Sequence, residues 1–290
     1  METKDIQIRD PFIVPVAEEG KYIMFGSTDP DIWNPPGFGF DAWESPDLKN
    51  WNGPIPAFRP PQDFWSDRNF WAPEVHEYRG QWYMFATFNA PDRYRGTQIL
   101  SGDSVRGPFR PHSDGPVTPS DWSCLDGTLH VTADGKPWMV FCHEWIQIKD
   151  GTICAVQLTD DLKESTGPVH TLFAASDAPW AEPIKDGTAY VTDGPFVLQL
   201  NGNLAMIWSS FRNGSYAIGV AYSDSGITGP WRQDDEPLYQ NDGGHGMIFR
   251  DFAGTPYLAI HTPNRTPDER AIFLPLDISV NSRLALSSGS

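Results

Sequence analysis

Three aspartates, Asp10, Asp126 and Asp193, open predicted strands of this chain, and each is followed directly by glycine or proline. Taken singly, such an aspartate is usually a turn residue or a cap. All three stand at the start of the same repeating unit, so a fold that arranges the units around one point would bring their carboxyl groups together. Converging carboxyl groups can act as general acid and general base, which is what cleavage of a glycosidic bond requires.

A fourth carboxyl group, Glu144, lies between His143 and Trp145 in an apolar and aromatic stretch. A buried glutamate needs either a raised pKa, which suits a general acid, or an ionic partner. Both interpretations are open at this point. Glu144 is a second candidate for the proton donor, or it forms a salt bridge with an arginine.

Aromatic and polar side chains near the ends of predicted strands complete the candidate site. Aromatic faces cover the apolar faces of sugar rings, while polar groups bind the sugar hydroxyls. We therefore expect substrate to be bound by Phe25, Trp71, Trp145 and Ser209. Arg270 either binds a substrate hydroxyl or neutralises an acidic pocket, and His245 either closes a hydrogen-bond network or acts as a ligand.

The elements that position these residues follow a fivefold internal repeat. In each unit a short signature is followed, 11 or 12 residues later, by an apolar and aromatic run, and the signatures begin at Asp10, Trp71, Asp126, Asp193 and His245. A glycine lies shortly before every run, as a tight hairpin requires. Each unit reads as four short antiparallel strands. The sequence therefore predicts an all-β chain folded as a five-bladed β-propeller with four antiparallel strands per blade.

One catalytic domain spanning residues 1–290 accounts for the whole repeat. The fifth unit is short, and we expect the N-terminal segment Ile6-Gln7-Ile8-Arg9 to complete it. Long connections at 28–42, 52–70 and 172–190 are expected to wall the site, since binding residues concentrate on loops carried by a rigid scaffold. The alternative architecture is a β-sandwich with similar turns, and the constant spacing in all five units argues against it.

The net charge of −17 argues against nucleic acid and anionic membranes as partners. No apolar run reaches the length of a membrane span. The three cysteines lack metal-type spacing, so we expect buried free thiols. Because the N-terminus has no apolar leader, we expect a cytoplasmic protein, or a secreted or periplasmic one whose leader has been removed. The sequence makes no prediction of oligomeric state.

Five short motifs, in this order and with these spacings, resemble those of glycoside hydrolase family 43. The resemblance runs from residue 8 to about residue 278. The motifs are Ile8-Arg9-Asp10-Pro11, Trp71-Ala72-Pro73-Glu74-Val75, Leu125-Asp126-Gly127-Thr128, Asp193-Gly194-Pro195 and Gly243-Gly244-His245-Gly246. Members of this family are five-bladed propellers that invert configuration at the anomeric carbon, typically as α-L-arabinofuranosidases, β-xylosidases or endo-arabinanases.

The resemblance implies a role for each motif. Asp10 matches the general base, and Asp126 matches the carboxylate that adjusts the pKa of the acid. Asp193 stands where the family usually has a general-acid glutamate, so its carboxyl group is one methylene shorter, and Glu144 is the alternative acid. His245 matches a histidine beside a calcium ion on the propeller axis. Arg270 loosely matches an arginine that reaches the terminal sugar.

The predicted function is an inverting, exo-acting glycoside hydrolase that releases a terminal pentose, with α-L-arabinofuranose as the first candidate. Its partners would be plant-type oligosaccharides or polysaccharides, and its one cofactor a calcium ion. The alternatives are a β-xylosidase or another exo-glycosidase of the same family. A sugar-binding propeller without catalysis is a further alternative, because Asp193 is shorter than the usual acid.

Overall fold

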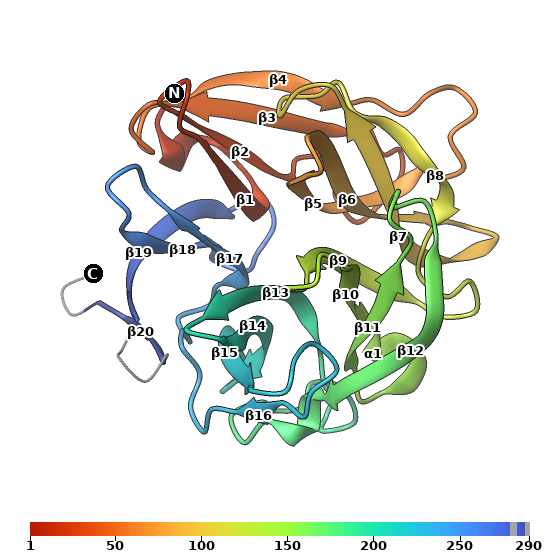
Figure 1. Ribbon diagram of the computed structural model, residues 1–290, viewed down its shortest axis with the longest axis vertical. Coiled ribbons are helices and arrows are strands. Elements are labelled where there is room, and N and C mark those ends of the chain that lie inside the picture. The colour runs from red at the N-terminus through yellow and green to blue at the C-terminus, as the bar shows by residue number, and fades with distance from the viewer. Residues whose placement is uncertain (279–282, 288–290) are drawn as a thin grey trace.

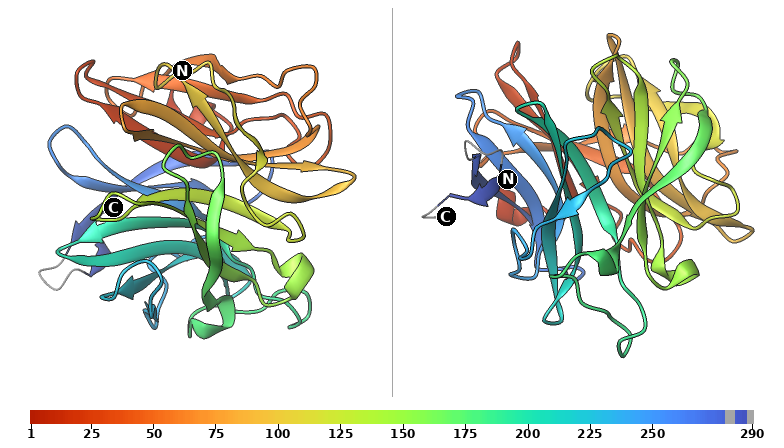
Figure 2. Two further views of the ribbon diagram at one scale, coloured as in Figure 1. Left: turned by 45° about the vertical axis from the view of Figure 1, so that its right-hand side comes forward. Right: turned by 60° about the horizontal axis from the view of Figure 1, so that its bottom comes forward.

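The computed structural model describes residues 1–278 and 283–287, and these residues form five four-stranded sheets. The sheets stand around a common axis like the blades of a propeller (Figure 1). Neighbouring strands are antiparallel, and the strands of each sheet follow one another along the chain. The predicted five-bladed, all-β architecture is confirmed. Figure 2 shows the sheets from two further directions, with hairpins projecting from both ends of the blades.

The blades follow the sequence in order. Blade one contains β1 (Arg9–Val16), β2 (Lys21–Ser27), β3 (Phe40–Ser45) and β4 (Asn52–Phe58). Blade two contains β5 (Arg68–Tyr78), β6 (Gln81–Ala90), β7 (Arg93–Gly102) and β8 (Arg110–Pro116). Blade three contains β9 (Cys124–Val131), β10 (Pro137–His143), β11 (Thr152–Leu158) and β12 (Ser165–Ala174). Blade four contains β13 (Asp193–Leu200), β14 (Asn203–Arg212), β15 (Ser215–Ser223) and β16 (Arg232–Gln233). Blade five contains β17 (Gly244–Arg250), β18 (Pro256–Thr262), β19 (Arg270–Ile278) and β20 (Leu284–Leu286).

Helical structure is confined to three short segments in the described part of the chain. They are η1 (Thr3–Asp5), α1 (Trp145–Ile148) and η2 (Ala175–Asp177). No helix within residues 1–278 and 283–287 is long and apolar enough to cross a membrane.

The hairpin between the first two strands of each blade depends on a glycine. Each of these glycines has a left-handed φ, between 61° and 90°, which other residues adopt only at a cost in energy. They are Gly20, Gly80, Gly135, Gly202 and Gly254. The glycine recognised before each apolar run is therefore the residue that reverses the chain and sets the register of the two inner strands.

The apolar runs predicted as second strands form the hydrophobic layers between neighbouring sheets. Blades one and two meet through a cluster of aromatic rings: Phe40, Phe58, Phe64, Phe70 and Phe88. Phe25 on β2 is fully buried in the same core and packs edge to face against Phe109, with ring centroids 6.4 Å apart. The prediction that Phe25 binds substrate is wrong, because its ring lies between the sheets and not at the end of the strand.

Blade five is completed by β20 and not, as predicted, by the N-terminal segment. Ile6 and Ile8 are buried in the core of blade one, which holds the segment there. The segment still touches blade five: Gln7 bridges Arg270 at the start of β19, and Ile8 N–H donates to the Glu269 carbonyl at 3.3 Å. Blades one and five therefore lie side by side and close the ring (Figure 1).

Candidate active site

A cavity of about 910 Å³ opens at the mouth of the propeller where the first strands of the blades begin. Residues from all five blades line it, together with part of the connection between β2 and β3. Asp10, Asp126 and Asp193, which the repeat predicts at one mouth, all line this cavity, and so does His245. The residues that could carry chemistry are thus brought together from four blades.

Each first strand has a shift of register near its start, as in a β-bulge. One residue of each irregularity is left-handed, with φ between 47° and 58°: Asp10, Ala72, Asp126, Gly194 and His245. Asp193 comes one residue earlier and pairs with Ser209 on β14, just as Trp71 pairs with Thr87 on β6. The sequence suggested that the three aspartates are equivalent, and the structure shows that they are not. Asp10 and Asp126 share one position in the blade, and Asp193 shares the position of Trp71.

Hydrogen bonds join these left-handed residues around the axis. In four of the five, the backbone N–H donates to a side chain on the second strand of the preceding blade, at 2.9–3.2 Å: Ala72 to Ser27, Asp126 to Thr87, His245 to Ser209 and Asp10 to His261. In blade three Cys142 occupies the acceptor position, and the N–H of Gly194 is accepted instead by Asp126 Oδ2 at 2.9 Å. Asp126 thereby fixes the backbone next to Asp193.

The same ring of hydrogen bonds explains the role of the Ser209 hydroxyl. Its side chain is fully buried, and its hydroxyl accepts the N–H of His245. The prediction that Ser209 binds substrate is wrong, since the hydroxyl is directed into the next blade and positions His245.

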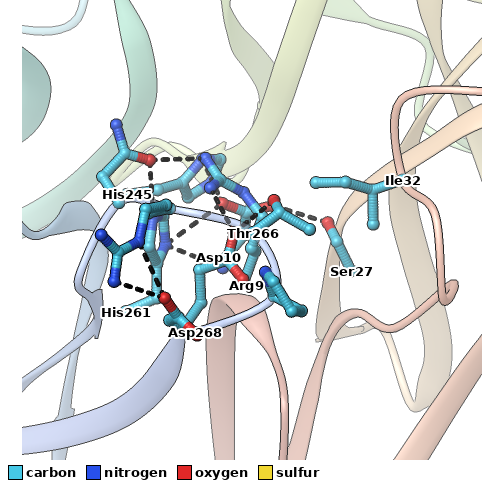
Figure 3. A network of polar contacts seen from close by, with 12 residues as sticks. Arg9, Asp10, Ser27, Ile32, His245, His261, Thr266 and Asp268 are labelled. Atoms are coloured by element: carbon cyan, nitrogen blue, oxygen red, sulfur yellow. Dashed lines mark hydrogen bonds and ion pairs between the residues drawn. The ribbon is translucent and has the colours of Figure 1, made fainter.

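Asp10 is held as a carboxylate by its neighbours (Figure 3). Ser27 donates its hydroxyl to Asp10 Oδ2 at 2.6 Å, and Nδ1 of His245 lies 3.3 Å from Oδ1. Burial alone would raise the pKa of Asp10, but His245 and Arg9 outweigh this effect and lower the pKa below its ordinary value. A general base must be ionised to accept a proton, and Asp10 meets that requirement.

Two histidines adjoin Asp10 and differ in their electrostatics. His261 accepts the N–H of Asp10 at Nδ1, and burial, assisted by Arg9, lowers the pKa of its imidazole to about 3. For His245, burial would lower the pKa, but the carboxyl groups of Asp10 and Asp126, both within 3.5 Å of Nδ1, raise it. His261 is therefore a neutral acceptor, and His245 is the group that Asp10 and Asp126 share.

Asp126 and Asp193 retain their protons to higher pH than an ordinary aspartate. Burial raises the pKa of both side chains, and other carboxylates of the cavity add to the effect, whereas His245 opposes it. The hydroxyl of Tyr216 donates to Asp193 Oδ2 at 2.9 Å. The cavity thus contains an ionised carboxylate, Asp10, and two carboxyl groups with raised pKa values, Asp126 at about 8 and Asp193 at about 6.

Glu144 forms the salt bridge that the sequence left as one of two interpretations. Arg95 Nη1 lies 2.5 Å from each carboxylate oxygen of Glu144, and Ser123 donates its hydroxyl to Oε2 at 2.6 Å. The guanidinium of Arg95 also lies 4.2 Å from the ring centroid of Trp71. Glu144 lines the cavity, and its structural effect is to anchor Arg95 against the face of Trp71.

The two tryptophans predicted to bind substrate both line the cavity, Trp71 from β5 and Trp145 from the start of α1. Arg270 is not among the lining residues. Its guanidinium donates to three backbone carbonyl groups, one of which belongs to Lys4 of the N-terminal segment. The prediction that Arg270 reaches the sugar is wrong, because the side chain ties the N-terminal segment to β19.

Arg9, Trp33 and Tyr216 are among the lining residues that were not predicted as site residues. Arg9 directly precedes Asp10, and regular strand alternation would place the two side chains on opposite faces. The left-handed residue at Asp10 breaks this alternation and allows both to line the cavity. Tyr216 comes from β15, a third strand, which reasoning from the first strands alone does not reach.

In a comparison with known protein families, residues 4–274 match the family described as "Glycosyl hydrolases family 43". The chain belongs to glycosyl hydrolase family 43. This confirms the family that the five motifs predict and assigns the protein to enzymes that act on O-glycosyl bonds.

The chain is also similar to individual proteins, two of them with solved structures. An endo-arabinase from Bacteroides thetaiotaomicron is 40% identical, with a TM-score of 0.89, over 97% of this chain and 98% of that chain. The extracellular endo-α-(1→5)-L-arabinanase 1 of Bacillus subtilis (strain 168) is 26% identical over 210 residues, which cover 67% of this chain and 59% of the relative. A thermostable family-43 glycoside hydrolase, 22% identical over 100% of this chain and 97% of that chain, shares the fold with a TM-score of 0.82.

The calcium ion implied by the resemblance to family 43 can be tested against the residues near His245. Within the described residues, no three His, Cys, Asp or Glu side chains form a group that could hold a metal, whereas Ca²⁺ takes six to eight oxygen ligands. The described residues therefore do not form a cage of carboxylates for such an ion.

Proposed function

We propose that this family 43 protein is an inverting hydrolase of α-L-arabinan. The observation that carries the proposal is the contrast, in one cavity, between Asp10, whose pKa is lowered by its neighbours, and Asp193, whose pKa burial raises to about 6. Inverting glycosidases need one carboxyl group of each kind on opposite sides of the bond. The choice of arabinan is supported by the likeness to an endo-arabinase and to an endo-α-(1→5)-L-arabinanase.

In this proposal Asp10 accepts a proton from a water molecule as that water attacks the anomeric carbon. Asp193 gives its proton to the glycosidic oxygen while the bond between that oxygen and the anomeric carbon breaks. The products are a sugar of inverted configuration with a new hydroxyl group, and a shortened chain. Asp126 accepts the N–H of Gly194 and so keeps the backbone of the acid in place.

Asp193 is the better candidate for the proton donor. Both carboxylate oxygens of Glu144 accept charge-assisted hydrogen bonds from Arg95, and one also accepts the hydroxyl of Ser123. Charge-assisted bonds of this type are among the strongest in proteins, so Glu144 is committed to Arg95. Asp193, by contrast, accepts a neutral hydroxyl from Tyr216 and has a raised pKa. The shorter side chain is compensated in this proposal by its fixed orientation.

We propose an endo mode of cleavage, in place of the exo mode that the long connections suggested. A cavity of about 910 Å³ stands at the upper end of the range of roughly 300–1,000 Å³ that encloses whole drug-sized ligands. A single pentose would leave most of this space unfilled. The space is consistent with several consecutive sugar units, and release of terminal pentose remains the alternative product pattern.

A product analysis on linear α-1,5-arabinan tests this function. The wild-type protein should release arabino-oligosaccharides at early times with a rapid fall in viscosity, and Asp10→Asn should release none. Early release of arabinose alone would replace the endo mode with the exo mode. Cleavage of xylan and not of arabinan would overturn the choice of substrate.

We also propose a calcium ion beside His245, held mainly by water. Nδ1 of His245 faces the carboxyl groups of Asp10 and Asp126, which leaves Nε2 as the nitrogen that can contact an ion. When bound, the ion would supply positive charge and fix the imidazole behind the carboxyl groups. Removal of divalent ions with EDTA should lower the melting temperature, and Ca²⁺ should restore it. A melting temperature that is indifferent to both would exclude the ion.

A further inference from the structure

Trp33 is an exposed tryptophan in the wall of the catalytic cavity, with 51% of its surface accessible. Single exposed apolar side chains are common in soluble proteins and need no explanation. Trp33 differs because its position is strongly fixed. Its backbone N–H donates to Asp31 Oδ1 at 3.0 Å, and its carbonyl accepts the side-chain amide of Asn69 at 3.2 Å.

The indole ring itself is held by three directional contacts. Its Nε1 donates to Thr266 Oγ1 at 3.2 Å. The guanidinium of Arg9 lies 5.4 Å from the ring centroid, and Trp71 meets the ring nearly edge to face at 5.3 Å. Thr266 thus occupies the polar edge of the indole and Arg9 lies over one of its faces, while the residue as a whole stays 51% exposed.

The groups that hold the ring belong to the network that closes the propeller (Figure 3). Arg9 on β1 donates to Oε1 of Glu269 at 2.9 Å, and Thr266 donates its hydroxyl to the same oxygen. Glu269 is fully buried and lies just before β19. The orientation of Trp33 is therefore set by contacts between blade one and blade five.

We propose that Trp33 is a stacking platform for a neutral furanose unit of the polysaccharide, next to or beyond the units that flank the cleaved bond. The inference rests on the proposed arabinan-hydrolase function. The indole N–H is already bound to Thr266 and Arg9 lies over one face, so the ring offers its other face, which suits the C–H surface of a sugar. A preoriented ring also loses little conformational entropy when the sugar binds.

The charge of the cavity defines which polysaccharide fits. Its lining contains the carboxyl groups of Asp10, Asp126, Glu144 and Asp193. Arg9, the cation beside Trp33, is already paired with Glu269 and also donates to Asn264. An acidic polymer would therefore meet repulsion without a compensating cation on this side, whereas an uncharged pentan would not.

The test compares a long and a short substrate. In Trp33→Ala, kcat/KM on linear arabinan should fall roughly tenfold more than kcat/KM on 4-nitrophenyl α-L-arabinofuranoside, which is the effect of losing one aromatic contact. The loss should appear mainly in KM. Thr266→Val, which removes the hydroxyl that orients the ring, should show a smaller selective loss of the same kind.

Phe252→Ala is the matched control, because Phe252 is 45% exposed, does not line the cavity and stacks on Tyr22. This substitution should leave kcat/KM unchanged on both substrates. Equal losses of Trp33→Ala on both substrates, or none on arabinan, would overturn the platform while leaving the proposed function intact. If the wild-type protein cleaves no arabinan, the proposed function fails first, and the platform fails with it.

Discussion

Removing one hydroxyl group should move the pH profile in a direction that identifies the proton donor. Tyr216 is buried, and its hydroxyl donates to Asp193 Oδ2 at 2.9 Å. Burial raises the pKa of Asp193, and the hydrogen bond from Tyr216 opposes this by stabilising the carboxylate. In Tyr216→Phe the opposing bond is lost, so the pKa of Asp193 rises further. The ring itself remains, stacked on His261 with centroids 5.8 Å apart.

The size of the shift follows from the energy of that bond. A hydrogen bond to a charged group contributes about 1.5 kcal/mol at the lower end of its range. One pKa unit corresponds to about 1.4 kcal/mol. A general acid works while it is protonated, so a higher pKa keeps it active to higher pH. The basic limb of kcat/KM should therefore move upward by about one pH unit, while the acidic limb, set by Asp10, should move much less.

The assay is the pH dependence of kcat/KM on arabino-oligosaccharides for wild type, Tyr216→Phe and a control. Tyr239→Phe is suitable as the control, because its hydroxyl donates to the carbonyl of Asn241 and does not line the cavity. The control should keep the wild-type profile. A basic limb that stays in place in Tyr216→Phe, or moves downward, would refute Asp193 as the donor.

Three further substitutions probe the other carboxyl groups. Asp10→Asn should lower kcat at least about a hundredfold, the contribution of a general base, with an unchanged circular dichroism spectrum, and an unchanged kcat would exclude its role. Asp193→Ala should slow the hydrolysis of substrates with poor leaving groups far more than that of activated aryl glycosides, because an activated aryl group leaves without protonation. The same pattern in Glu144→Gln, and not in Asp193→Ala, would transfer the acid role to Glu144. Glu144→Gln should lower the free energy of unfolding in urea by about 3 kcal/mol, since it leaves the buried Arg95 without its anion, and a difference near zero would contradict that account.

The propeller could be predicted because its blades repeat the same local pattern. The hairpin glycine and the buried run recur at nearly constant spacing, and each repeat folds through contacts with its neighbours. The same spacing also contained a signal about Asp193. Twelve residues separate Asp10 from Tyr22, but eleven separate Asp193 from Leu204. That difference of one residue marks Asp193 as the counterpart of Trp71, whose spacing to Trp82 is also eleven.

A one-residue offset in a regular strand would turn a side chain to the opposite face. Asp10 and Asp193 nevertheless line the same cavity, because the left-handed residue, Asp10 in blade one and Gly194 in blade four, interrupts the alternation. A glycine in the sequence signals that a left-handed backbone conformation is possible, whereas an aspartate or a histidine gives no such signal. The prediction that the three aspartates meet was therefore right for their location, while their equivalence was wrong.

The misplaced residues share a physical cause. Phe25 and Ser209 lie on second strands, where depth along the strand decides between core and cavity, and periodicity does not report depth. Arg270 is long and could reach several acceptors, and its direction depends in part on the carbonyl group of Lys4, which lies 266 residues earlier in the chain. The connection 28–42 was expected to wall the site, but Trp33 within it was not identified, because the connection has no periodicity and the contact of Trp33 with Thr266 comes from the far end of the chain.

The central claim is that Asp10 and Asp193 hydrolyse arabinan with inversion, and the configuration of the first product tests it most directly. Proton NMR should follow the anomeric signals of arabino-oligosaccharides from the first minutes of hydrolysis, before mutarotation equilibrates them. Because the linkage is α, the account predicts that the β-configured reducing end appears first and the α form follows. An α-configured product that appears first would mean retention, and would contradict the assignment of Asp10 as the base that activates water.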